Sequence, residues 1–221
     1  MIPGLWLSEG GQSAAGDALD RLVRMHPALP ALEAETGGRV LARLTERAMA
    51  DPTAAVARAA HLTVVPDFNG NRAPLADPHA RAIVAGLGTA VDEASLQDLF
   101  VAGLVGVACG LRHILDAQAE AGLATETIVI SGGAGANPLA RRILADVTGR
   151  PVAVPATPEP VLLGAAMLGA VAGGMRKDIP AAMAAMARTA ETIVPDPAIG
   201  VQHDRTYRRF RALQEAARAG G

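Results

Sequence analysis

The spacing of apolar positions predicts an α/β chain in which helices outnumber strands. Short runs of β-branched residues at 62–65, 128–130 and 152–154 predict strands, the middle one buried. The order strand, helix, strand over residues 128–154 indicates a crossover unit. Apolar residues at helical spacing predict helices over 12–26, 39–49, 52–60, 95–121, 139–147, 161–172 and 204–219, with a further alanine-rich helix capped by Asp178.

Residues 127–143, TIVISGGAGANPLARRI, predict a strand, a glycine turn and a helix in immediate succession. Asn137 is expected as the N-cap and Pro138 as the first helical residue. This arrangement directs backbone N–H groups at whatever lies above the turn, which favours an anion such as a nucleotide phosphate. The alternative is that the glycines only let the helix pack close to the strand.

Residues 62–87 contain a long polar loop whose function needs an explanation. Ordering such a loop costs backbone entropy while burying little apolar surface. One interpretation is a loop at the edge of a cleft that touches substrate or phosphate, with Arg72 as a cation. The other is a surface turn in which Asp77 caps a helix beginning at Pro78. The loop carries Asp67, Asn69, Asn71, Arg72 and Asp77.

Two of the predicted helices are rich in small residues. Glycines within 95–121 are expected to permit tight contact with a neighbouring element, and Cys109 in the same helix is expected as a small core residue. The helix over 161–172 is predicted either as a core helix or as the wall of a nucleotide pocket. The basic residues of 204–219 are expected on a solvated face.

Composition narrows the range of partners. Hydrophobic residues make up 50% of the 221 residues and aromatic residues 2%, so the core must be built from small aliphatic side chains. The net charge of -2 does not favour binding to nucleic acid or to an anionic membrane. The sequence pattern predicts no segment that spans a bilayer, and a single cysteine fits a cytoplasmic location.

Several familiar catalytic motifs are missing from the sequence. It has no GxxxxGK[ST] loop, and the glycine turn does not complete GxGxxG because Asn137 and Pro138 follow Gly135. The five histidines lack metal-ligand spacing and are expected at the surface or as caps. We predict no metal site built from protein side chains, and no general base stands out.

The segments PGLWLSEGGQSAAG, PDFNGNRAPLADPHARAIVAGL, ISGGAGANPLARRILADVTGRPV and EPVLLGAAMLGAVAGG together resemble the C-terminal half of the FGGY carbohydrate kinases, in particular ribulokinase-like pentulose kinases. The resemblance covers nearly the whole chain, and it is the order and spacing of the segments that make it specific. It implies a ribonuclease-H-like lobe of the actin, hexokinase and Hsp70 type, a mixed sheet flanked by helices. Residues 1–221 are then expected to be one C-terminal, nucleotide-binding domain.

The resemblance also implies site residues and cofactors. Gly132, Gly133 and Ala134 match the turn that touches the α-phosphate and ribose of ATP, and Asn137 matches a polar residue near the adenine. Asn69, Asn71 and Arg72 match a loop near the transferred phosphate, with Mg²⁺ bridging the phosphates.

The chain is about half as long as members of that family. The catalytic base and the sugar pocket are expected in an N-terminal lobe that this sequence lacks, so the chain alone is predicted not to phosphorylate a sugar. The resemblance favours ribulose as the sugar.

Two alternative functions remain open. The chain could be a non-catalytic actin-like assembly module, with the apolar residues 1–11 favouring a homodimer. A dinucleotide-binding oxidoreductase domain is disfavoured by the incomplete glycine pattern.

Overall fold

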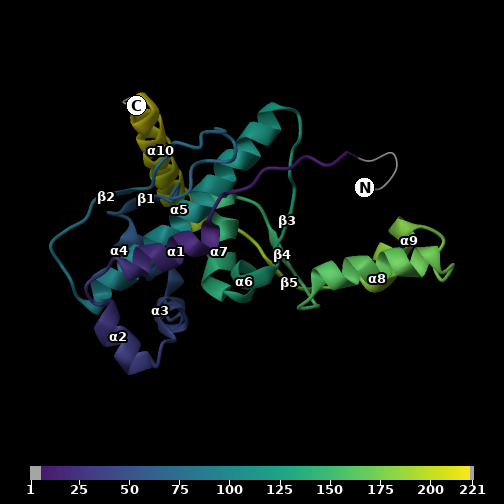
Figure 1. Cartoon of the computed structure of the whole chain (residues 1–221), viewed down its shortest axis with the longest axis horizontal. Helices are drawn as coiled ribbons and strands as arrows, with labels where there is room; N and C mark the ends of the chain where they lie inside the picture. The colour runs from purple at the N-terminus through teal and green to yellow at the C-terminus, as the bar shows by residue number, and fades with distance from the viewer. Residues whose placement is uncertain (1–5, 220–221) are drawn as a thin grey trace.

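A computed structural model of the chain describes residues 6–219 (Figure 1). The helices are α1 (Ala15–Arg24), α2 (Leu29–Thr36), α3 (Val40–Met49), α4 (Pro52–Ala59), α5 (Glu93–Glu120), α6 (Gly132–Ala136), α7 (Pro138–Thr148), α8 (Pro160–Ala172), α9 (Ile179–Met186) and α10 (Pro197–Ala219). The strands are β1 (Thr63–Val65), β2 (Ile83–Ala85), β3 (Ile128–Val129), β4 (Val152–Pro155) and β5 (Thr189–Ile193).

The long helix α5 lies at the centre of the core, packed against α1, α4, α7 and β1. Its glycines allow this close packing, as predicted. A Cβ atom on Gly106 would collide with the backbone carbonyl of Val64, and one on Gly103 would lie 2.9 Å from Leu22 Cδ1. Cys109 is fully buried, and burial raises the pKa of its thiol to about 12. Gly103 and Gly106 therefore accept no larger side chain unless the residues next to them shift.

By length and composition alone, α5 could cross a membrane, which corrects the expectation that no segment could. Its most apolar window has a mean hydropathy of 1.6, but 72% of that window is buried inside the protein. That burial identifies α5 as a core helix.

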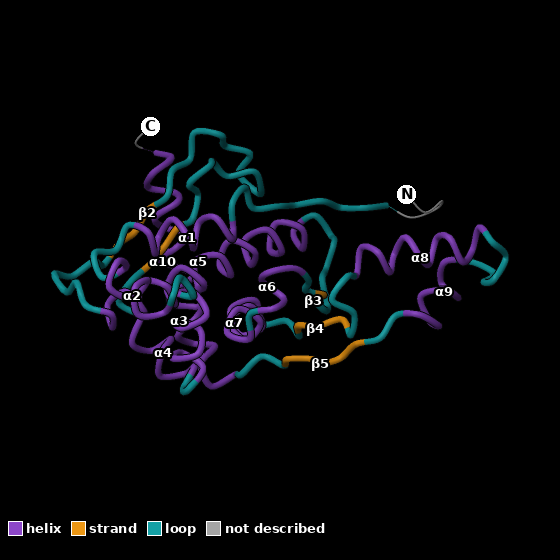
Figure 2. The backbone as a smooth tube through the Cα atoms, turned by 60° about the horizontal axis from the view of Figure 1, so that its bottom comes forward, coloured by secondary structure: helices purple, strands orange, loops and turns teal. Residues whose placement is uncertain are grey.

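The strands form two sheets (Figure 2). β1 and β2 are an antiparallel pair, while β3, β4 and β5 form a mixed sheet in that order. β3 and β4 are parallel, with Ile128 opposite Val152, which confirms the crossover unit through α7. The expectation that the strand over 128–130 is wholly buried is wrong for Val129, which is 70% exposed, whereas Ile130 is buried. Successive side chains of a strand point to opposite faces, and the face that carries Val129 is exposed.

Helix α2 and strands β2 and β5 were not expected from the sequence. Helix α2 contains Pro30, a residue that breaks helices in their interior, but Pro30 lies in the first turn, where a missing N–H is tolerated. Strand β2 pairs antiparallel with β1, and β5 pairs antiparallel with β4.

Two details of the predicted helix ends were wrong. Residues 78–82 run as a loop, so Asp77 caps no helix there and its Oδ1 instead accepts from the backbone N–H of His79 at 2.9 Å. The last helix begins at Pro197, well before Asp204. By contrast, the N-cap expected from Asp178 is confirmed.

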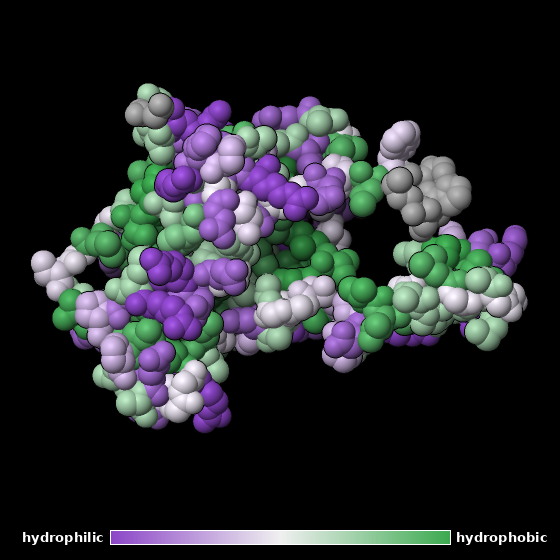
Figure 3. Space-filling model, in the orientation of Figure 1, coloured by the Kyte–Doolittle hydropathy of each residue, from purple (hydrophilic) through white to green (hydrophobic). Residues whose placement is uncertain are grey.

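Helices α8 and α9 pack mainly against each other and stand to one side of the core (Figures 1 and 2). Helix α8 was predicted as a core helix or as a pocket wall, and it is neither, because its small residues contact few other residues. Cβ atoms added at Gly164 or Gly169 would have no neighbour within 4 Å. Apolar side chains cover much of the visible face of this pair (Figure 3). On α8, Val161, Leu162 and Leu168 are 81%, 65% and 58% exposed.

Candidate functional site

The glycine-rich stretch after β3 forms a single turn of helix, α6, where an irregular turn was predicted. Gly132 has a left-handed φ of 70°, which lets the chain leave the strand and start the helix at once. Gly135 packs against the strand, since a Cβ there would lie 3.3 Å from the carbonyl oxygen of Ile130. Gly133 faces open space, with nothing within 4 Å of an added Cβ. Close packing on the strand therefore accounts for Gly135 but leaves Gly133 unexplained.

Asn137 joins three elements at this point. Its Oδ1 accepts from the backbone N–H of Ala140 at 3.0 Å, which confirms it as the N-cap of α7, with Pro138 next. Its Nδ2 donates to Oγ1 of Thr45 on α3, also at 3.0 Å. The cap and the bond to α3 together fix the orientation of the amide.

A broad cavity of about 760 Å³, largely open to solvent, lies between α3 and the α6–α7 corner, which are neighbours in Figure 1. Gly133 and Asn137 line it, whereas Gly132 and Ala134 do not. Its size is within the range of small-molecule sites. The lining residues are Leu41, Ala42, Thr45, Glu46, Met49 and Ala50 from one side and Gly133, Ala136, Asn137 and Pro138 from the other.

The contribution of α3 to the wall of this cavity was not predicted from the sequence. Leu41 and Met49 are 38% and 37% exposed, and with Thr45 between them they recur every four residues along one face. The available signal was the spacing of Leu41, Thr45 and Met49, which places them on one face of a helix. Such a wall suits a flat aromatic ring, with polar groups confined to its edge.

The loop holding Asn69, Asn71 and Arg72 does not contribute to this cavity. Asn71 is buried, and its amide is used inside the loop: Nδ2 donates to Asp67 and Oδ1 accepts from the N–H of Leu75, each at 3.1 Å. Arg72 is exposed and pairs with Glu9 at 2.5 Å. This lobe therefore keeps the two predicted groups of site residues on different faces.

A second cavity of about 410 Å³ lies beside that loop, against α10. Its lining mixes charges of both signs, including Asp67, Asp77 and Arg218, with Arg218 Nε 4.0 Å from Asp77. None of the predicted site residues lines it. It is the better enclosed of the two cavities, but we consider it a weaker candidate because its charged groups already have partners.

Two histidines are buried, where only surface or capping positions were expected. His113 Nδ1 lies 3.1 Å from Gln214 Oε1, and burial lowers its pKa. His203 is 1% exposed and neither ring nitrogen has a hydrogen-bond partner within the described structure. Within residues 6–219, no group of three potential metal-binding side chains is close enough to hold an ion.

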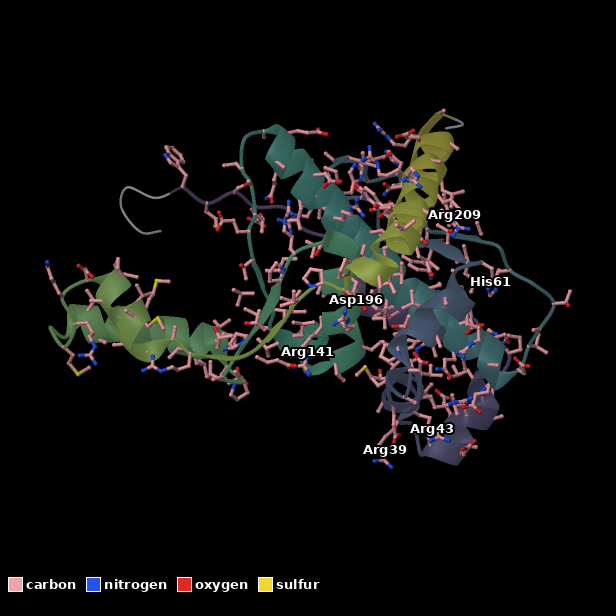
Figure 4. All side chains as sticks on the ribbon, turned by 180° about the vertical axis from the view of Figure 1, so that it is seen from behind. Arg39, Arg43, His61, Arg141, Asp196 and Arg209 are labelled. Carbon is pink, nitrogen blue, oxygen red and sulfur yellow. The ribbon has the colours of Figure 1, made fainter. Side chains whose placement is uncertain are left out.

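The basic face of α10 is only partly solvated. Arg209 lies beside His61 (Figure 4) and donates to the carbonyl of Ala60 at 2.7 Å. Arg141 on α7, labelled in the same view, pairs with Glu191 on β5 at 3.2 Å, while Asp196 donates its backbone N–H to Asp146 at 2.7 Å. These contacts fix α10 and β5 on the lobe that carries the cavity.

Comparison with known proteins identifies the family. The model of the FGGY family of carbohydrate kinases, C-terminal domain, matches residues 1–173. This chain belongs to the FGGY family. The predicted resemblance is therefore confirmed.

Individual members of the FGGY family are similar over most of this chain. An FGGY carbohydrate kinase domain-containing protein of Danio rerio is 41% identical, covering 97% of this chain and 41% of its own length. A D-ribulokinase of Saccharomyces cerevisiae is 35% identical over 76% of this chain and 25% of the yeast protein. The crystal structure of xylulose kinase from Rhodospirillum rubrum superimposes with a TM-score of 0.76 at 31% identity, covering 95% of this chain and 39% of that one.

This structural similarity confirms the expected fold, an actin- and hexokinase-type lobe with a mixed sheet flanked by helices. The chain spans about two fifths of the length of the zebrafish relative.

Proposed function

We propose that this chain is the nucleotide-binding, C-terminal lobe of an ATP-dependent carbohydrate kinase, with residues 1–221 acting as one domain. The observation that carries the proposal is the cavity between α3 and α6, because it is lined by Gly133 and Asn137, two of the residues proposed for the nucleotide. Gly132 and Ala134 are proposed to touch the ribose and α-phosphate from the same turn.

The cavity suits an adenine ring. One face of the ring packs on Leu41 and Met49, and the other lies against α6, where Gly133 has no side chain to occupy the space. Asn137 keeps one N–H and one lone pair free for the edge of the ring, because its hydrogen bonds to Thr45 and Ala140 use one of each.

The phosphates extend away from this cavity towards the rest of the kinase. Mg²⁺ is held largely by phosphate oxygens and water in such sites, so we expect it to arrive with the nucleotide. The loop that carries Asn69, Asn71 and Arg72 is proposed to face the transferred phosphate when two lobes close on the substrates, with the buried Asn71 holding the shape of the loop through its bonds to Asp67 and Leu75. Arg72 is exposed, so only its ion pair with Glu9 must open for that contact.

The acceptor is proposed to be a pentulose such as ribulose. Similarity to a yeast D-ribulokinase and to a bacterial xylulose kinase supports this class of sugar. We assign the sugar pocket and the catalytic base to an N-terminal lobe, and we propose the cytoplasm as the location. The chain alone is then inactive as a kinase, because a carboxylate must accept the hydroxyl proton of the sugar.

Calorimetric titration with ADP and Mg²⁺ tests the nucleotide site. We expect saturable binding that Gly133→Val weakens at least tenfold, because the valine side chain fills the space left for the ring. Gly16→Val is the matched control: it is also a helical glycine with nothing within 4 Å of an added Cβ, but it lies on α1 outside the cavity. Equal binding by all three proteins, or no binding by the unchanged chain, would contradict the proposal.

A second candidate function is a non-catalytic assembly module in which the chain forms a homodimer. The exposed apolar face of α8 favours it, since side chains such as Val161 and Leu162 are exposed next to one another. Light scattering over a dilution series distinguishes a dimer from a monomer. Nucleotide binding by a monomer that does not associate favours the first function.

A further inference from the structure

The hydrogen bond between α3 and Asn137 gives Thr45 a role that deepens the proposed function and rests on it. Thr45 lies midway along the face of α3 that lines the cavity, 92 residues from its partner in sequence, and is 8% exposed. Its Oγ1 accepts from Asn137 Nδ2 at 3.0 Å. The bond thus joins the two walls of the cavity.

Other threonines at or within helices of this chain bond differently. Thr36, Thr148 and Thr206 each donate their hydroxyl to the carbonyl four residues earlier, at 2.7, 2.6 and 3.2 Å. That local bond is the usual one for a helical threonine. Thr45 instead accepts a hydrogen bond from another element, through Asn137 Nδ2.

The two bonds to Asn137 determine which amide atoms a ligand meets. Oδ1 must remain an acceptor, because a flipped amide would place its N–H groups against the N–H of Ala140. The bond to Thr45 then holds the amide at the cavity wall. The amide then offers a ligand one acceptor, Oδ1, beside the second hydrogen of Nδ2.

That pattern is complementary to adenine. Adenine presents an N–H₂ donor beside a ring-nitrogen acceptor, and a side-chain asparagine pairs with those two atoms bidentately. Guanine presents two acceptors, O6 and N7, on the equivalent edge. We infer that Thr45 is a positioning residue which orients the Asn137 amide and so sets the preference of the site for adenine over guanine nucleotides.

Two substitutions of Thr45 separate this role from simple packing. Thr45→Val keeps the side-chain shape and removes the hydroxyl, whereas Thr45→Ser keeps the hydroxyl. We expect Thr45→Val to weaken MgADP binding about threefold to tenfold, the usual effect of one neutral hydrogen bond. MgGDP binding should change less, so the ratio of the two dissociation constants falls. Thr45→Ser should keep both the affinity and the ratio within about twofold.

The measurement is a calorimetric titration of each variant with MgADP and with MgGDP, beside thermal unfolding to check that each is folded. Thr36→Val is the matched control, since its hydroxyl bonds within α2 and it does not line this cavity. Unchanged MgADP binding by Thr45→Val, or equal losses for both nucleotides that Thr45→Ser does not restore, would overturn the role of Thr45. Absence of MgADP binding by the unchanged chain would instead contradict the nucleotide site itself, and the role of Thr45 with it.

Discussion

Single residues show where sequence reasoning succeeds and where it stops. Asn137 could be assigned as a helix cap because the signal, asparagine followed by proline, is local. Thr45 could not be assigned, because its partner is distant in sequence and a threonine in a helix usually bonds its own helix. The burial of His203 could not be predicted either, because the neighbouring sequence does not indicate whether a histidine is buried or has a hydrogen-bond partner.

His203 should make the lobe sensitive to acid. Burial, and secondarily Arg112, lowers its pKa from 6.5 to about 4, while Asp204 opposes that shift. Between those values the unfolded chain binds the proton more readily than the folded one, so stability falls as the pH drops from 6.5 towards 4. From pH 7 to pH 5 we expect a loss of about 2 kcal/mol from this group.

Urea unfolding at pH 7 and pH 5 measures that loss. His203→Gln should lose less stability over the interval than the unchanged chain, whatever its stability at pH 7. The exposed His79, replaced in the same way, serves as the control and should leave the pH dependence unaltered. An identical pH dependence in His203→Gln and the unchanged chain would show that the histidine is not kept neutral by burial.

Helices and strands were predicted well where the spacing of apolar residues is regular. They were predicted badly where contacts with neighbouring elements determine the structure. The helices α5 and α7 and the strand pair around α7 follow directly from their patterns. The short helix α2 and the edge strand β5 have weak local signals and form because neighbours stabilise them. For α8, small residues predicted close packing, yet they lie on a helix whose main neighbour is α9.

In the second candidate function, the exposed apolar surface of α8 drives self-association of the chain. Leu162 and Leu168 are 65% and 58% exposed, and burying each side chain contributes about 1.5–3 kcal/mol. A double change to lysine should therefore raise the dissociation constant of a dimer at least tenfold. Light scattering across a dilution series provides the measurement.

Leu87→Lys is the matched control for α8, because Leu87 is 64% exposed but lies in the loop between β2 and α5. It should leave association unchanged. A chain that is monomeric at every concentration, or a double variant that associates like the control, would rule out α8 as the contact surface.

At the scale of the whole molecule, we propose that the lobe carries one wall of a larger active site. The family and the fold were predictable because ordered segments along the entire chain resemble one family. The arrangement of the two predicted groups of site residues was not, since it depends on how α3 and α10 pack around α5. The cavity between α3 and α6 and the loop at Asn69, Asn71 and Arg72 remain on separate faces of this lobe.

The most direct test of the proposed nucleotide site is to locate the nucleotide by NMR. Assigned backbone amide signals of the labelled chain would be recorded during titration with MgADP. We expect the largest shifts to cluster at Thr45, Met49, Gly133 and Asn137 around the cavity of about 760 Å³. Shifts that cluster instead at Asp77 and Arg218, around the cavity against α10, would contradict that site, as would a spectrum that does not change at all.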